Sequence, residues 1–270
     1  VAKLRESFKE SWGLDLQLHQ RYINWLVDIP TLDWGQSRLY RQPVVEVLDG
    51  RVQATLEYVL SGVALAILLG ILLGLVAAFS KNGFLDWSSR IGAYVLLGIP
   101  AFISAIYFSF FSGKELLSLG GHAIMFPVLG NKTVAALAVA LSLLAGQVRY
   151  VRAAIIDELG QEFVKMLRAK GTTRLHIARH VLRNAAIPIV SLSVAELLGV
   201  LMLNIYVIEN VLGIPGLAEA NLRAVQTTIN SPPDLQLAIW TSMVLVFIGI
   251  AGNLVQDILY GYLDPRIQSD

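Results

Sequence analysis

The stretch YVLSGVALAILLGILLGLVAAFS at residues 58–80 decides the fold, because it is apolar along its length and contains no charged residue. A helix needs about 20 consecutive apolar residues to cross the hydrocarbon core of a bilayer, and this stretch is long enough. It also places Gly70 and Gly74 four positions apart, a small-residue pair that lets a second helix approach closely. We therefore predict a membrane-spanning helix packed tightly against a neighbour.

The remainder of the chain has the same character. Hydrophobic residues make up 55% of its 270 residues and charged residues only 15%, against about 25% charged residues in soluble domains. Because backbone groups in lipid must be hydrogen-bonded internally, each apolar stretch should be helical. The chain is thus predicted to be an all-α, polytopic membrane helical bundle with five visible spans. The other four spans are expected at residues 91–111, 133–148, 184–208 and 235–255.

Basic residues predict the orientation of the bundle. The loop at residues 149–183 carries eight Lys and Arg against three acidic residues, whereas residues 209–234 carry one basic residue against three acidic ones. Loops rich in Lys and Arg stay in the cytoplasm, so the 149–183 loop is expected there. Residues 1–54 then form a small external N-terminal segment, and residues 55–270 form the transmembrane domain. A sixth span, preceding residue 1, is expected to be missing from this sequence.

The 149–183 loop has the pattern of a docking element. Residues 161–171 predict a short amphipathic helix with Phe163 and Leu167 on one face and basic side chains elsewhere. Gly171 is placed to end this helix, and Thr172 or Thr173 to start the next. Such a helix could offer an apolar anchor to a groove on a partner. The composition alone equally fits a basic loop that only enforces topology.

Four sets of residues resemble the oligopeptide/dipeptide permease family of ABC importers. The family's EAA loop resembles RAKG at residues 168–171 followed by RHVLRNAAIP at 179–188, and its external E-x-x-F-x-x-P-G segment resembles ENVLGIPG at 209–216, with Leu212 in place of the aromatic residue. The C-terminal signature resembles NLVQDILYGYLDPR at 253–266. Near the start, Tyr22, Trp25 and Pro43 resemble the B-type subunit. Lys165, Met166 and Leu167 depart from the broader EAA motif.

The resemblance implies a non-catalytic permease subunit, multi-pass in the inner membrane, that forms half of a translocation path for di- or oligopeptides. Its expected partners are a second permease subunit, two ATP-binding subunits, an external substrate-binding protein and the lipid bilayer. No GxxxxGK[ST] motif is present, so ATP and Mg are expected in the partner subunits and no cofactor in this chain. The ATPase-coupling helix would use these residues: Glu162, Phe163, Leu167, Arg168, Ala169, Lys170 and Gly171. The external gate would use Glu209, Pro215 and Gly216.

Glu196 is the one acidic residue expected inside a span, where an unpaired charge costs several kcal/mol. We expect it to face water, as part of the translocation path or in a helix–helix hydrogen bond. The four histidines have no spacing that suggests a metal site. A secondary transporter is the main rival from another class, although such proteins carry several intramembrane charges. Within the family, nickel, glutathione and oligosaccharides are alternative cargoes.

Overall fold

The computed structural model describes residues 16–109, 118–119, 122–123, 130–226 and 232–263. Over these residues it is almost entirely helical, which confirms the predicted all-α class. A two-residue strand pair, β1 (Ser118–Leu119) and β2 (His122–Ala123), is antiparallel. The helices are α2 (Leu18–Thr31), α3 (Val44–Phe79), α4 (Phe84–Leu97), α5 (Ala101–Ser109), α6 (Asn131–Leu159), α7 (Glu162–Ala169), α8 (Arg174–Asn184), α9 (Ala186–Leu212), α10 (Leu217–Val225) and α11 (Leu235–Leu263).

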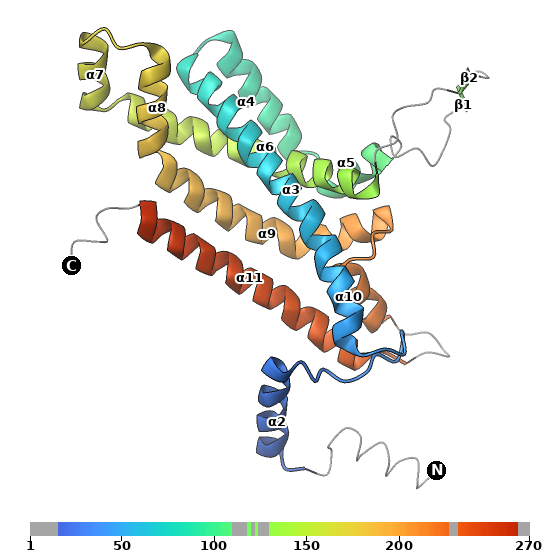
Figure 1. Ribbon diagram of the computed structural model, residues 1–270. Coiled ribbons are helices and arrows are strands. Elements are labelled where there is room, and N and C mark those ends of the chain that lie inside the picture. The colour runs from blue at the N-terminus through green and yellow to red at the C-terminus, as the bar shows by residue number, and fades with distance from the viewer. Residues whose placement is uncertain (1–15, 110–117, 120–121, 124–129, 227–231, 264–270) are drawn as a thin grey trace.

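Long helices form the body of the molecule, and short ones lie at its two ends (Figure 1). α3 packs along α6, α9 packs against α6, and α11 packs against α9 and α10. Helices α7 and α8 lie at one end, called the α7 end below, and α2 and α10 lie at the other, called the α10 end (Figure 1). The two candidate segments from the sequence are therefore at opposite ends of the bundle.

Three helices in the described part of the chain are long and apolar enough to cross a membrane: α3, α6 and residues Leu235–Leu259 of α11. They contain the stretches expected at residues 58–80, 133–148 and 235–255. α6 also continues beyond the span expected at residues 133–148 and runs unbroken to Leu159. The span expected at residues 184–208 is helical from Ala186 onward, in α9, whereas Asn184 is the last residue of α8.

The stretch at residues 91–111 was wrongly predicted to be one continuous span. It is divided into α4 and α5 around Pro100, with Gly98 as the C-cap residue of α4. Proline has no N–H to donate and its ring crowds the preceding turn, so the α4 hydrogen-bond ladder ends before it. The Pro100 carbonyl instead accepts from Ile103 N–H at 2.9 Å, in the first turn of α5.

α3 starts earlier than the apolar stretch within it. Its first residue is Val44, after Pro43 at the N-cap position, so the domain boundary expected at residue 54 falls inside a helix. Hydropathy marks the part of a helix that suits lipid, whereas helical hydrogen bonding continues through polar residues such as Glu46 and Asp49. Residues 44–54 are consequently part of the same rigid rod as the apolar stretch.

Glycines bring α3 and α6 into close contact. A Cβ atom added at Gly62, Gly70 or Gly74 would lie only 2.5–2.8 Å from the Cβ of, respectively, Val139, Gln147 or Val151 in α6. The partner advances by the same number of positions as the glycine, so the two helices run parallel and in register. This contact confirms the predicted Gly70–Gly74 face and extends it to Gly62.

Buried side chains form two clusters. The larger one joins α3, α6, α9, α10 and α11 towards the α10 end, and includes Tyr58, Ile208 and Leu237. The smaller one lies at the α7 end and joins the ends of α3 and α6 to α7, α8 and the start of α9, with Val164 and Ile155 among its members. Each end of the bundle therefore has its own packed core, and α3 and α6 contribute to both.

Gly70→Val should destabilise the bundle, because the valine side chain would overlap Gln147 of α6, which already lies against the α3 backbone at Gly70. Overpacking of this kind costs about 1–3 kcal/mol. The measurement is the thermal unfolding midpoint of the purified protein in detergent. Gly50→Ala is the matched control in the same helix, since nothing lies within 4 Å of an added Cβ there. Equal midpoints for the two variants would contradict the close contact.

Candidate functional site

α7 is a short helix with well-defined ends. Glu162 lies in its first turn and Arg168 in its last, each favourable for the helix dipole. Gly171 has φ +72°, and two hydrogen bonds close the turn: Gly171 N–H to Arg168 O at 3.0 Å and Thr172 N–H to Leu167 O at 3.1 Å. This pattern is a Schellman motif, which favours glycine in the left-handed conformation. The prediction that Gly171 ends the helix is confirmed.

α8 follows almost directly. Thr173 is its N-cap residue, and the Thr173 hydroxyl accepts from His176 N–H at 3.4 Å, as the sequence predicted. His176 and His180 lie one turn apart, with their Nε2 atoms at 3.0 Å. The described residues hold no group of three or more His, Cys, Asp or Glu side chains that could bind a metal.

The apolar face of α7 packs on the chain's own core. Val164 is fully buried, and Phe163 and Leu167 pack against the cluster formed with Val151 and Ile155 of α6. Phe163 and Leu167 are half-buried against this core, and their expected contact with a partner stays a prediction. Helical periodicity identified the face correctly and could not tell which molecule covers it.

The opposite face of α7 is exposed. Arg168, Ala169, Lys170 and Gly171 are all exposed, and Glu162 pairs with Lys165 at 2.8 Å in a solvated ion pair. The exposed large apolar side chains of this region are Met166 in α7 and Leu175 in α8. The α7 end thus presents basic groups around two apolar side chains, on a helix held firmly from behind.

An ion pair near the α7 end joins α4 to α6. The Arg152 guanidinium donates to both carboxylate oxygens of Asp86, with Nη2 to Oδ2 at 2.9 Å. Asn82 N–H donates to Oδ2 at 3.0 Å, and Asp86 is only 1% exposed. The Arg152 hydrogen bond, helped by Asn82, lowers the pKa of Asp86 to about 2. Sequence reasoning missed this pair because its partners are far apart along the chain and belong to no local motif.

A second buried carboxylate lies at the α10 end. Glu209 is fully buried in the last turn of α9. It accepts hydrogen bonds from the Thr55 hydroxyl at 2.6 Å, the Tyr58 hydroxyl at 3.0 Å and Glu219 N–H at 2.8 Å. The Thr55 hydroxyl in turn accepts from Leu217 N–H at 2.9 Å. Glu209 therefore joins α3 to the N-terminus of α10.

The turn between α9 and α10 is shaped around this carboxylate. Gly213 has φ +61°, and Ile214 N–H returns to Glu209 O at 2.9 Å, so the chain reverses at the end of α9. A Cβ at Gly216 would lie 2.2 Å from Glu209 Oε1, so only glycine lets the carboxylate approach the backbone here. Pro215 is exposed on the outside of the turn. The structure thus brings Glu209 and Gly216 together and leaves Pro215 at the rim.

Glu196 does not join this group. It lies within α9, but the described part of the chain does not include its side chain, so its expected role in the path stays a prediction. Asp264, Pro265 and Arg266, the end of the C-terminal signature, lie outside the described residues as well.

Charged and polar side chains hold α10 in place beyond Glu209. Glu219 pairs with Arg51 of α3 at 2.6 Å and also with Arg223. The Arg51 guanidinium lies 4.7 Å from the ring centre of Tyr40, a cation–π distance. On its other side, α10 contacts α11 through Asn221, whose Nδ2 donates to Thr241 Oγ1 at 2.8 Å. The short helix is therefore fixed to both α3 and α11.

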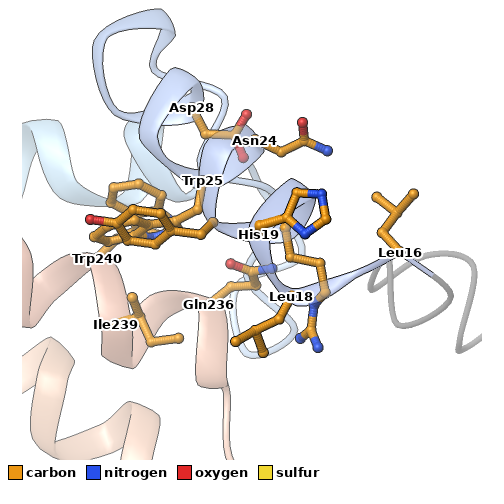
Figure 2. Close-up of a pocket in the computed structure, with 11 residues that line it drawn as sticks. Leu16, Leu18, His19, Asn24, Trp25, Asp28, Gln236, Ile239 and Trp240 are labelled. Carbon is orange, nitrogen blue, oxygen red and sulfur yellow. The ribbon is translucent and has the colours of Figure 1, made fainter.

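A hollow lies beside α2 at the start of α11, lined by aromatic and polar side chains (Figure 2). The ring of Trp25 stacks over Trp240 with centroids 6.2 Å apart, and Trp34 stacks on Trp240 at 4.7 Å. His19, Asn24 and Asp28 project from α2 around this hollow (Figure 2). The aromatic contacts attach the segment before α3 to α11 and suit a membrane interface.

Comparison with known proteins agrees with this architecture. The profile of the family described as binding-protein-dependent transport system inner membrane component matches residues 70–269. The chain is 27% identical to the dipeptide transport system permease protein of Lactococcus lactis subsp. cremoris, over 97% of this chain and 85% of that protein. It is 27% identical to the oligopeptide transport system permease protein of Bacillus subtilis, over 98% of this chain and 85% of that protein. It is 28% identical to the glutathione transport system permease protein of Shigella boydii serotype 4, over 99% of this chain and 85% of that protein.

Solved structures share the fold. A chain of the inward-facing MetNI methionine ABC transporter matches with a TM-score of 0.64 at 16% identity, over 82% of this chain and 98% of that one. A chain of an amino acid ABC transporter matches with a TM-score of 0.57 at 15% identity, over 80% of this chain and 93% of that one. The family match extends over most of the sequence and includes both candidate ends. The chain belongs to the family of binding-protein-dependent transport system inner membrane components, as a permease subunit of an ABC importer.

Proposed function

We propose that this chain forms half of the translocation path of an importer for dipeptides or oligopeptides, and that ATP-binding subunits drive it through α7. The observation that carries the proposal is the way α7 is held. Its apolar face is packed onto the end of α6 through Val164, and its other face is exposed and basic. A push on the exposed face would move α6 rather than deform a loop.

The charge distribution supports the orientation that this function needs. The α7 end contains the strongly basic 149–183 segment, whereas the α9–α11 connection at the α10 end is acidic. By the positive-inside rule, the α7 end faces the cytoplasm, where ATP is available. The α10 end then faces outward, where a substrate-binding protein would deliver cargo.

The partner subunits are inferred from what this chain offers. Its sequence has no phosphate-binding loop of the Walker type, so ATP and Mg would be held by the two ATP-binding subunits. Met166 and Leu175, surrounded by basic side chains, suit a partner groove with an apolar floor and an acidic rim. Only 17% of the apolar window of α11 is buried, which leaves surface for lipid and for a second permease subunit.

The cargo is inferred from the relatives. Their names specify dipeptide, oligopeptide and glutathione transport, and glutathione is itself a small peptide. These relatives are matched over nearly the whole of this chain, including the segments at both ends. Uptake of labelled dipeptides and longer peptides into proteoliposomes that contain the full transporter tests this assignment, and nickel uptake without peptide uptake would contradict it.

Gly171→Glu and Ala169→Arg should abolish ATP-driven uptake while leaving membrane insertion intact. Both sites are exposed, so the core at the α7 end is not disturbed. Gly171→Glu also forces a side chain into the left-handed region, at a cost of about 1–2 kcal/mol. The measurements are uptake into vesicles and co-purification of the ATP-binding subunits.

Gly171→Asn is the matched control, because asparagine tolerates the left-handed conformation and nothing lies within 4 Å of an added Cβ. It should keep most of the uptake. Normal ATP-coupled uptake by both Gly171→Glu and Ala169→Arg would refute the assignment of α7.

Asp86→Asn should lower the unfolding midpoint and the uptake together, because it leaves the Arg152 guanidinium without its counter-ion beside the end of α6. Breaking a buried ion pair lowers the free energy of unfolding by roughly 3–5 kcal/mol. We expect a loss near the lower end of this range, because the Arg152 side chain is 20% exposed. Glu162→Gln, in the exposed pair with Lys165, is the control and should cost at most about 1 kcal/mol. Thermal melting in detergent distinguishes the two, and equal shifts would show that the Asp86 pair has no special role.

A further inference from the structure

Glu209, which the sequence placed in the expected external gate, is a fully buried carboxylate at the end of the molecule opposite α7. We propose that Glu209 is a positioning residue that fixes α10 to α3, so that the two move as one body during the transport cycle. The inference rests on the proposed function, because it concerns how a movement that starts at α7 reaches the α10 end.

The groups around Glu209 suit a carboxylate. The hydroxyls of Thr55 and Tyr58 and the backbone N–H of Glu219 all donate to it. Its two oxygens accept all three of these hydrogen bonds at once. An amide would have to turn its NH2 group towards the two hydroxyls, which would then accept instead of donate.

The link involves the backbone of α10 as well as its side chains. Leu217 N–H donates to Thr55, and Glu219 N–H donates to Glu209, so two of the unpaired N–H groups in the first turn of α10 are bonded through α3 and α9. The carboxyl group of Glu209 also lies at the positive end of the α10 dipole, which favours a carboxylate there. Displacing α10 from α3 would therefore break several buried hydrogen bonds together and leave a carboxylate without donors.

The packing of α3 provides a path to the other end. Val164 of α7 packs in one cluster with Val151 and Ile155 of α6. Val151 contacts Gly74 of α3, and α3 runs unbroken from there to Thr55 and beyond (Figure 1). The path from α7 to Glu209 thus runs through only two helices, α6 and α3, which are in close parallel contact.

α10 is also attached to α11, so the effect of losing the Glu209 link can be distinguished from the loss of α10 as a folded helix. Asn221 fixes α10 to α11 through Thr241 and Ser242, and Tyr206 of α9 donates to Asn221 at 3.1 Å. Loss of the Glu209 link would leave α10 attached to α11, and attached to α3 by the Arg51–Glu219 ion pair near the helix surface. The helix would then stay folded in place and follow the movement of α3 less closely.

Thr55→Val tests this most cleanly, because it removes the hydroxyl that bridges Glu209 and Leu217 without changing the size of the side chain. In the complete transporter in proteoliposomes, we expect the ATP-binding subunits to co-purify and ATP hydrolysis to continue. Peptide uptake per ATP hydrolysed should fall at least tenfold. Thr55→Ser keeps the hydroxyl and should restore uptake. Thr31→Val is the matched control, since the Thr31 hydroxyl bonds only within α2.

A distance measurement reports the joint movement directly. The chain has no cysteine, so spin labels can be placed at Leu60→Cys in α3 and Val225→Cys in α10, both exposed sites. The distance should be the same in nucleotide-free and ATP-trapped states of the otherwise wild-type protein. With Thr55→Val added, it should broaden or shift between the two states.

Two results would overturn the proposal. One is a label distance that changes by several ångströms between states in the wild type, and the other is normal uptake with an unchanged distance in Thr55→Val. Neither result affects the proposed function if the ATP-binding subunits still co-purify and the α7 variants still lose uptake. Failure of the wild-type permease to bind ATP-binding subunits would instead remove the proposed function itself.

Discussion

Close contact between α3 and α6 connects everything else in this molecule. In lipid, apolar side chains gain little by leaving their surroundings, so helices associate through van der Waals packing and interhelical hydrogen bonds. Gly62, Gly70 and Gly74 allow that packing by placing the α3 backbone directly against α6. Because the two helices are parallel and in register, they act as one double rod. Both clusters of buried residues are built on it, one at each end.

Each end of this rod has a buried carboxylate, and the two are stabilised differently. Asp86 is neutralised by the guanidinium of Arg152, so α4 and α6 are joined by a full ion pair. Glu209 has no cation among its hydrogen-bond partners and relies on two hydroxyls, a backbone N–H and a helix N-terminus. Burial of a charge is costly unless such partners are present. In both cases the cost of burying the carboxylate is offset only in the arrangement of helices that brings its partners together. These contacts therefore favour one arrangement of the helices over others.

The sequence predicted what depends on local pattern. Apolar runs located α3, α6 and α11, and the positions of Gly171 and Thr173 located the boundary between α7 and α8, because caps depend on neighbouring residues. Contacts between distant residues could not be predicted. Asp86 and Arg152 belong to no common motif, and the apolar face of α7 that carries Phe163 was predicted without its packing on the end of α6. The stretch at residues 91–111 was predicted as one span although it contains Pro100, because proline can also be tolerated within a membrane helix.

The three longest apolar helices are buried to different extents within the bundle. The apolar window of α6 is 67% buried, that of α3 33% and that of α11 17%. α6 is thus the interior helix, and it is also the helix on which α7 packs. A force applied at α7 reaches the most enclosed part of the bundle first, where neighbouring helices cannot yield independently. α11 joins the rest near the α10 end, through apolar residues such as Leu237 and Trp240 and through the hydrogen bonds of Asn221. α10, which Glu219 holds to α3 and Asn221 holds to α11, is therefore the element that connects α11 to the double rod.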